Sequence, residues 1–108
     1  MAELTEQEFR RHLFTKFQIP AENRDPLELE LVEVTGYQGD DSQESGMERF
    51  SVFFIGPPNV ELPQYTYPLH HSELGVCDIF LVPVGLEEKG YRYEAVFNYY
   101  RKNNESSK

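Results

Sequence analysis

The stretch LPQYTYPLHHSELGVCDIFLVPVG, residues 62–85, decides the fold. It predicts two strands, Tyr65–His70 and Val76–Val84, joined by a tight turn. In the second strand both alternating sets of side chains are apolar: Cys77, Ile79 and Leu81 on one face, and Phe80, Val82 and Val84 on the other. A strand that is apolar on both faces is covered on both faces, so we place it at the centre of the fold.

Further strands are predicted on both sides of this pair. They are Leu27–Val34, Phe50–Ile55 and Tyr91–Asn98, with Lys16–Ile19 as a sixth strand where alternation continues. The short connections between successive strands favour an antiparallel arrangement. We therefore predict a mainly β fold, either a small antiparallel β-barrel or a strongly curled sheet of five or six strands. One N-terminal helix is expected to cover an opening or a face of it.

The helix is predicted from its start signal and its apolar face. Thr5 and Glu8 fit a capping box, in which the Thr5 hydroxyl accepts from the Glu8 backbone N–H and the Glu8 carboxylate reaches back to the Thr5 N–H. Phe9 and Leu13 then share one face, with Phe14 on its flank. We expect the helix to end near Phe14.

The strand patterns also predict irregularities and a core. The alternation in Leu27–Val34 slips by one residue, which predicts a β-bulge near Leu31–Val32. Pro68 has no N–H to donate, so its strand is expected to be an edge or a bulged strand. Residues 39–46, GDDSQESG, predict a polar surface loop. Shared alternation predicts one core cluster of Phe54, Ile79, Leu81 and Phe97.

Length and charge limit the classes of function. The 108 residues predict a single domain over residues 1–100 and a polar tail over 101–108. The 19 acidic residues exceed the 10 Lys and Arg by nine, and this acidic chain lacks the basic footprint that nucleic-acid binding requires. Its N-terminus lacks the apolar stretch of a secretory signal, and no apolar run reaches 18 residues. With one cysteine, Cys77, and no internal disulfide, we expect a cytoplasmic protein that is not in a membrane.

Four segments together resemble a small bacterial family described only as a domain of unknown function. They are LPQYTY at 62–67, HSELG at 71–75, FLVPV at 80–84 and YEAVFN at 93–98. The similarity runs from about Phe9 to Asn98. It brings no established activity and no residue roles. The resemblance implies an association with phage-tail-like collar or fibre proteins.

The only clustered chemistry lies at His70, His71 and Glu73. Neighbouring residues on a strand point to opposite faces, so the two histidines cannot chelate one ion unless the chain turns between them. A structural role explains this cluster better, in which His71 or Ser72 caps the turn before Gly75 by binding backbone groups. Chemistry centred on His70 and His71, metal-dependent or hydrolytic, stays an alternative. We predict no catalytic residues, no metal site and no cofactor.

The remaining signal is surplus apolar and aromatic surface. One short helix cannot cover the second apolar face of both central strands. Tyrosine suits interfaces because one end is apolar and the other is wet. We therefore predict a non-catalytic interaction or assembly module that binds a protein partner or a second copy. The candidate interface residues are Phe53, Val82, Tyr65, Tyr67 and Tyr93. The alternative is a small barrel that binds an apolar ligand.

Overall fold

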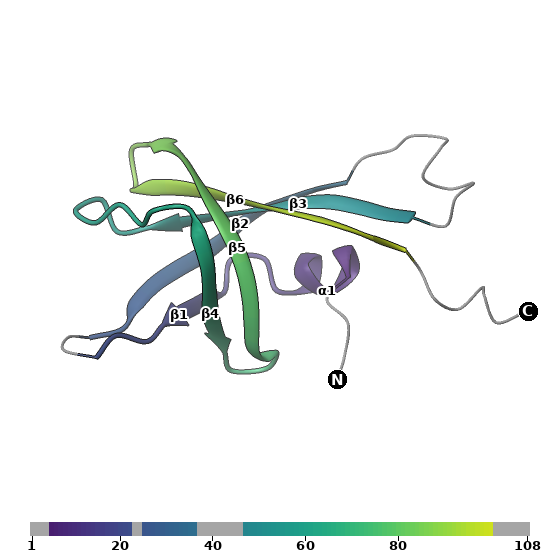
Figure 1. The fold of residues 1–108 in the computed structure, drawn as a ribbon, viewed down its shortest axis with the longest axis horizontal. Helices are drawn as coiled ribbons and strands as arrows, with labels where there is room; N and C mark the ends of the chain where they lie inside the picture. The colour runs from purple at the N-terminus through teal and green to yellow at the C-terminus, as the bar shows by residue number, and fades with distance from the viewer. Residues whose placement is uncertain (1–4, 23–24, 37–46, 101–108) are drawn as a thin grey trace, which may run out of the picture.

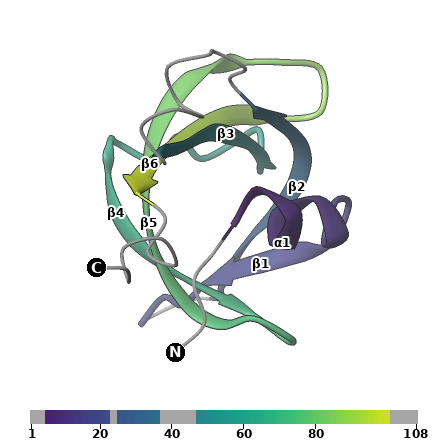
Figure 2. The same cartoon turned by 90° about the vertical axis from the view of Figure 1, so that its right-hand side faces the viewer.

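The computed structural model describes residues 5–22, 25–36 and 47–100, and within these ranges the fold is a closed antiparallel β-barrel (Figures 1 and 2). The strands follow one another around the barrel in the order β1-β2-β3-β6-β5-β4. The elements are α1 (Glu6–Arg11), β1 (Lys16–Ile19), β2 (Leu27–Gly36), β3 (Met47–Gly56), β4 (Tyr65–His71), β5 (Gly75–Leu86) and β6 (Tyr91–Tyr100). The prediction of a mainly β barrel with an N-terminal helix is confirmed, and Lys16–Ile19 is its sixth strand. The predicted loop at 39–46 and tail at 101–108 lie outside the described residues.

Helix α1 begins where the sequence predicts and ends sooner. The Glu8 N–H donates to the Thr5 hydroxyl at 3.1 Å, which is the first half of the capping box. The Glu8 carboxylate accepts instead from Arg11 at 3.0 Å. The helix stops at Arg11 because Phe14 adopts a φ of 68° and its N–H donates to the Leu31 carbonyl of β2 at 2.6 Å. The chain has therefore turned into the sheet by Phe14.

The core follows the predicted alternation. Phe54, Ile79 and Leu81 are buried inside the barrel, and the partly buried Phe97 packs against the same cluster. The aromatic rings of Phe17 and Phe54 meet edge to face, 5.3 Å between centroids. The predicted core cluster is therefore confirmed, with Phe97 at its margin.

Two strands extend beyond the barrel. β3 and β6 pair along their whole lengths, whereas β5 pairs with β6 only as far as Val82 and Glu94 (Figure 1). Helix α1 packs on the inward side of this extension through Phe9, whose ring centroid lies 5.9 Å from that of Phe50 and 5.2 Å from that of Phe97. Figure 2 looks toward this end of the barrel, where α1 lies at the opening. The helix thus covers the opening, as expected.

The predicted bulge occurs, whereas the prediction of an edge or bulged strand at Pro68 is wrong, because β4 has a neighbour on each side in the closed barrel and pairs with β5 in unbroken register. The register between β2 and β3 shifts between Leu31 and Glu33, which confirms the bulge. β4 pairs along its length with β5 but meets β1 at one position, opposite Gln18. Pro68 is tolerated in β4 because the side of the strand toward β1 carries so little pairing.

Candidate functional site

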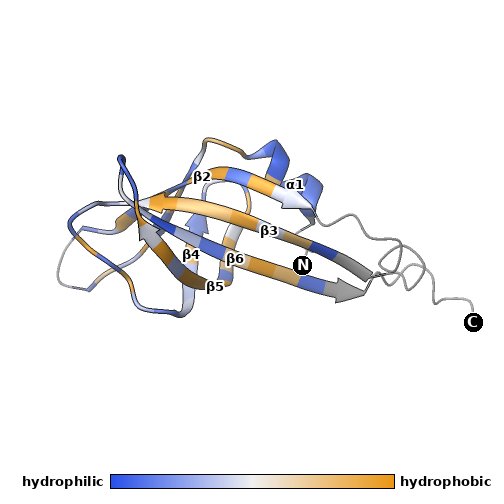
Figure 3. Ribbon diagram, turned by 90° about the horizontal axis from the view of Figure 1, so that it is seen from above, coloured by the Kyte–Doolittle hydropathy of each residue, from blue (hydrophilic) through white to orange (hydrophobic). Residues whose placement is uncertain are grey.

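Two of the five candidate interface residues share the outer wall of the barrel. Phe53 of β3 and Val82 of β5 both pair with Glu94 of β6, so the three form one row across the sheet. Phe53 and Val82 are each half-buried. β3 is hydrophobic along much of its length (Figure 3), because Phe53 and Ile55 in its outward phase are apolar, as is its inward face.

The residue that covers this row at Phe53 is Arg92, and no helix within the described ranges covers it there. The Arg92 guanidinium lies over the Phe53 ring, 4.5 Å from its centroid. Arg92 also forms ion pairs with Glu33 of β2 and, at 3.6 Å, with Glu87 of the β5–β6 turn. An arginine held by two carboxylates can shield an aromatic ring and stay hydrated at its edge. Phe53 is therefore less available for contact than its sequence pattern indicates.

The three tyrosines lie elsewhere. Tyr65 and Tyr67 stack edge to face near one end of the barrel, 5.4 Å between centroids, and the Tyr67 hydroxyl donates to the Pro63 carbonyl at 2.6 Å. Tyr93 is only 1% exposed, because β6 turns it inward beside Ala95. Its hydroxyl accepts from the Leu62 N–H at 2.9 Å. Burial raises the Tyr93 pKa. Tyr93 therefore anchors the β3–β4 connection and is corrected to a core residue.

Two exposed apolar residues of the barrel wall were not among the five candidate interface residues. On β5, Phe80 is 48% exposed and Val84 is also exposed, on either side of Val82. We call Phe80, Val82 and Val84 the β5 ridge. The alternation of the strand placed Phe80 and Val84 on the same face as Val82, but neither was chosen as a candidate interface residue.

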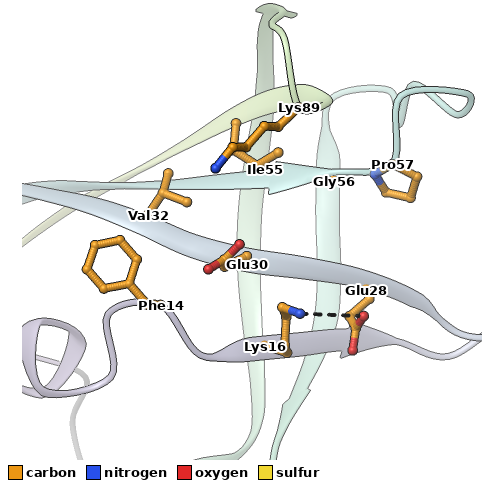
Figure 4. Close-up of a pocket in the computed structure, with 9 residues that line it drawn as sticks. All are labelled: Phe14, Lys16, Glu28, Glu30, Val32, Ile55, Gly56, Pro57 and Lys89. Carbon is orange, nitrogen blue, oxygen red and sulfur yellow. Dashed lines mark ion pairs between the residues drawn. The ribbon is translucent and has the colours of Figure 1, made fainter.

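A depression of about 370 Å³ lies on the outer face of β1, β2 and β3 (Figure 4). We call it the Phe14 depression. Its lining consists of Phe14, Lys16, Glu28, Glu30, Val32, Ile55, Gly56, Pro57 and Lys89. Lys16, Glu30 and Ile55 stand in one row across the three strands. The sequence prediction missed this site because it assigned Phe14 to the helix.

A second open groove, of about 580 Å³, lies at the barrel end. It is lined by Ile19, Pro20, Ala21, Glu22, Leu27, Leu62, Tyr67 and Pro68. The described interior itself is filled by side chains such as Phe17, Leu29 and Phe54, which have no exposed surface. Both depressions therefore lie outside the core.

His71 and His12, with Thr15 and Glu73, form a hydrogen-bonded cluster that we call the clasp. His70 is exposed, whereas His71 is buried on the opposite face of β4. The His71 Nδ1 accepts from the backbone N–H groups of Glu73 and Leu74, at 3.0 and 3.2 Å. Its Nε2 lies 3.0 Å from the Thr15 hydroxyl, which donates to the His12 carbonyl at 2.6 Å. These partners require a neutral His71 that carries its proton on Nε2. Of the two predicted caps, His71 and Ser72, it is His71 that binds the turn.

His12 supplies the second ring of the clasp. Its Nδ1 lies 2.8 Å from the Glu8 carbonyl and its Nε2 lies 3.0 Å from the Glu73 carboxylate, and both partners accept hydrogen bonds. The backbone hydrogen bond to Glu8 and then the bond to Glu73 raise the His12 pKa. Burial, and then the charge of His12, lower the His71 pKa. Their rings meet edge to face, 4.9 Å between centroids.

The clasp predicts that the pH profile of stability has two limbs. Because the His12 pKa is raised in the folded state, His12 stabilises the fold at pH values below its ordinary pKa of 6.5. This contribution is lost as the pH rises through the folded-state pKa. Because the His71 pKa is lowered in the folded state, neutral His71 stabilises the fold at pH values above 6.5. This contribution is lost as the pH falls toward the folded-state pKa. The free energy of unfolding, measured in urea from about pH 5.5 to about pH 8, should therefore fall on both sides of a maximum near the ordinary value.

Two variants separate the limbs. His12→Gln should remove the decline at higher pH and, because the His12 charge is lost, weaken the decline at lower pH. His71→Asn, whose side-chain carbonyl can still accept from the turn, should remove the decline at lower pH. If both variants keep the wild-type profile, neither histidine is the titrating group.

In the described ranges, no group of three or more His, Cys, Asp or Glu side chains is placed to hold a metal ion. Burial raises the Cys77 pKa, which disfavours the reactive thiolate. Among the described residues, no helix has the length and apolar character needed to cross a membrane.

A comparison with protein-family models identifies the family of this chain. Residues 4–97 match the family described as Domain of unknown function (DUF6916). The chain belongs to this family. The DUF6916 match confirms the resemblance to a family of unknown function. Comparisons with curated proteins and with solved structures returned no match.

Proposed function

We propose that this DUF6916 protein is a non-catalytic interaction module that binds another protein through the β5 ridge. The observation that supports this proposal is the exposure of Phe80 and Val84 on the outer wall, beside the half-buried Val82. Contiguous apolar side chains on a surface mark interaction sites more often than scattered ones do. The core does not need these residues, because the inward phase of β5 already supplies it.

The charge pattern supports a protein partner over a nucleic acid. The formal net charge is −9, which repels a phosphate backbone. The ridge itself is apolar, so the partner surface is expected to be apolar at its centre and polar at its rim.

The finer proposal places the module in a bacterial cytoplasm, as an accessory of a phage-tail-like or fibre assembly. It rests on the family resemblance of the four sequence segments. The buried Cys77 thiol is compatible with a reducing compartment. Tyr65 and Tyr67 pair with Leu81 and Ile79, so they lie in the opposite phase to Phe80 and form a surface at the barrel end separate from the β5 ridge.

Co-expression with the proteins encoded beside its gene tests both levels of the proposal. We expect the wild-type chain to co-purify with one of them, a collar or fibre protein under the finer proposal. Phe80→Glu should reduce the recovered partner at least about tenfold, because it places a charge in an apolar contact. Val76→Glu is the matched control, since Val76 is 59% exposed on the same strand but lies near the β4–β5 turn.

The result against the proposal is equally clear. Equal recovery with Phe80→Glu and wild type would show that the ridge is not the interface. Recovery of no partner by the wild-type chain would contradict the interaction module. A partner other than a collar or fibre protein would contradict only the finer proposal.

A further inference from the structure

Phe14 combines an unfavourable backbone with an exposed ring. Its φ of 68° lies in the left-handed region, which disfavours any residue with a Cβ. Phe14 lies two residues beyond the helix C-cap, His12, and glycine is the residue that adopts this backbone conformation without steric cost. Burial of the ring does not compensate within the described chain, since Phe14 is 67% exposed. Strain of this kind at an exposed aromatic residue points to a role outside the fold.

The surface beside Phe14 has the apolar contacts and charges of a docking site. Val32, Ile55 and Pro57 supply apolar lining, and the Phe14 ring lies beside Val32 (Figure 4). Lys16 and Glu28 approach to 3.9 Å. The other two charged residues of the lining, Glu30 and Lys89, form no ion pair with any residue in the described ranges.

The charge balance of the depression favours a second copy of the chain. Two lysines and two glutamates line it, so it is locally neutral in a protein whose formal net charge is −9. Two acidic copies meet least repulsion where each is neutral, and more distant charges are screened at physiological salt. A two-fold axis brings residue i of one copy to residue j of the other, and j to i. Glu30 and Lys89 have the opposite charges that such an exchange requires.

We propose that the chain forms a symmetric dimer through the Phe14 depression. The Phe14 ring of each copy enters the depression of the other, and Glu30 of each copy pairs with Lys89 of the other. The dimer uses a face and an occupant different from those of the β5 ridge, so it stands independently of the proposed function.

Sedimentation equilibrium of the full chain and its variants tests the dimer. Phe14→Gly should raise the dissociation constant at least about tenfold while raising the melting temperature, because glycine removes both the ring and the strain. Glu30→Lys and Lys89→Glu should each weaken the dimer about tenfold, and the double variant should restore it to within about threefold of the wild type. Glu61→Lys is the control for net charge, since Glu61 is exposed and lies outside the depression.

Each result decides the proposal. A monomeric wild type at about 1 mM would overturn it, because that bounds the affinity below the range of a specific interface. A dimer that Phe14→Gly and the single reversals leave unchanged lies on another face, which also overturns it. A double reversal that stays folded by melting temperature but does not restore the dimer excludes the Glu30–Lys89 exchange. A lower melting temperature for Phe14→Gly would show that the ring supports the fold.

Discussion

Phe54→Ala is expected to lower the free energy of unfolding by about 3–5 kcal/mol. Phe54 has no exposed surface and its ring packs edge to face on Phe17, 5.3 Å between centroids. Truncation removes the transfer free energy of the ring and leaves a cavity between strands that are tied on both sides. A closed barrel cannot collapse easily into such a space, since each strand is held by two neighbours.

The neighbouring residue is the matched control. Phe53 points to the outer wall and lies beneath the Arg92 guanidinium. Phe53→Ala should cost about 1 kcal/mol, the scale of an exposed cation–π contact with some lost packing. Urea denaturation of both variants measures the difference. Equal losses at the two positions would mean that the outward side of β3 is packed as tightly as its inward side.

Most of the fold could be predicted because alternation is a local property of the chain. The inward set of β5, Cys77, Ile79 and Leu81, follows directly from period two in the sequence. The β2 bulge was predictable for the same reason, since a shift of one residue reverses the apolar phase. The choice between a closed barrel and a curled sheet was not local. It depends on whether β1 meets β4, and the structure makes that closure through Gln18 and His70.

The candidate site was harder to predict because it depends on contacts between distant segments. Arg92 covers Phe53 from the adjacent strand, and its ion pair with Glu33 joins residues far apart in the chain. Tyr93 was assigned to the surface from its residue type, although its own alternation with Ala95 indicated the core. Phe14 was assigned to the helix because residue spacing does not report a left-handed backbone. The first error comes from weighing residue type above alternation, and the second from backbone geometry that spacing does not encode.

We infer that the fold does not depend on the outward apolar residues of β5. Phe80 and Leu81 test it within one strand, since Phe80 is 48% exposed and Leu81 is fully buried. Leu81→Glu should abolish cooperative folding, because a buried carboxylate without a partner costs several kcal/mol. Phe80→Glu should change the free energy of unfolding by less than about 0.5 kcal/mol, as a surface substitution does.

The most direct measurement is the free energy of unfolding of Phe80→Glu in urea, with Leu81→Glu alongside. We expect Phe80→Glu to have a free energy of unfolding close to that of the wild type, and Leu81→Glu to be unfolded. A loss above about 2 kcal/mol for Phe80→Glu, beyond the usual range for a surface position, would show that the outer wall belongs to the core.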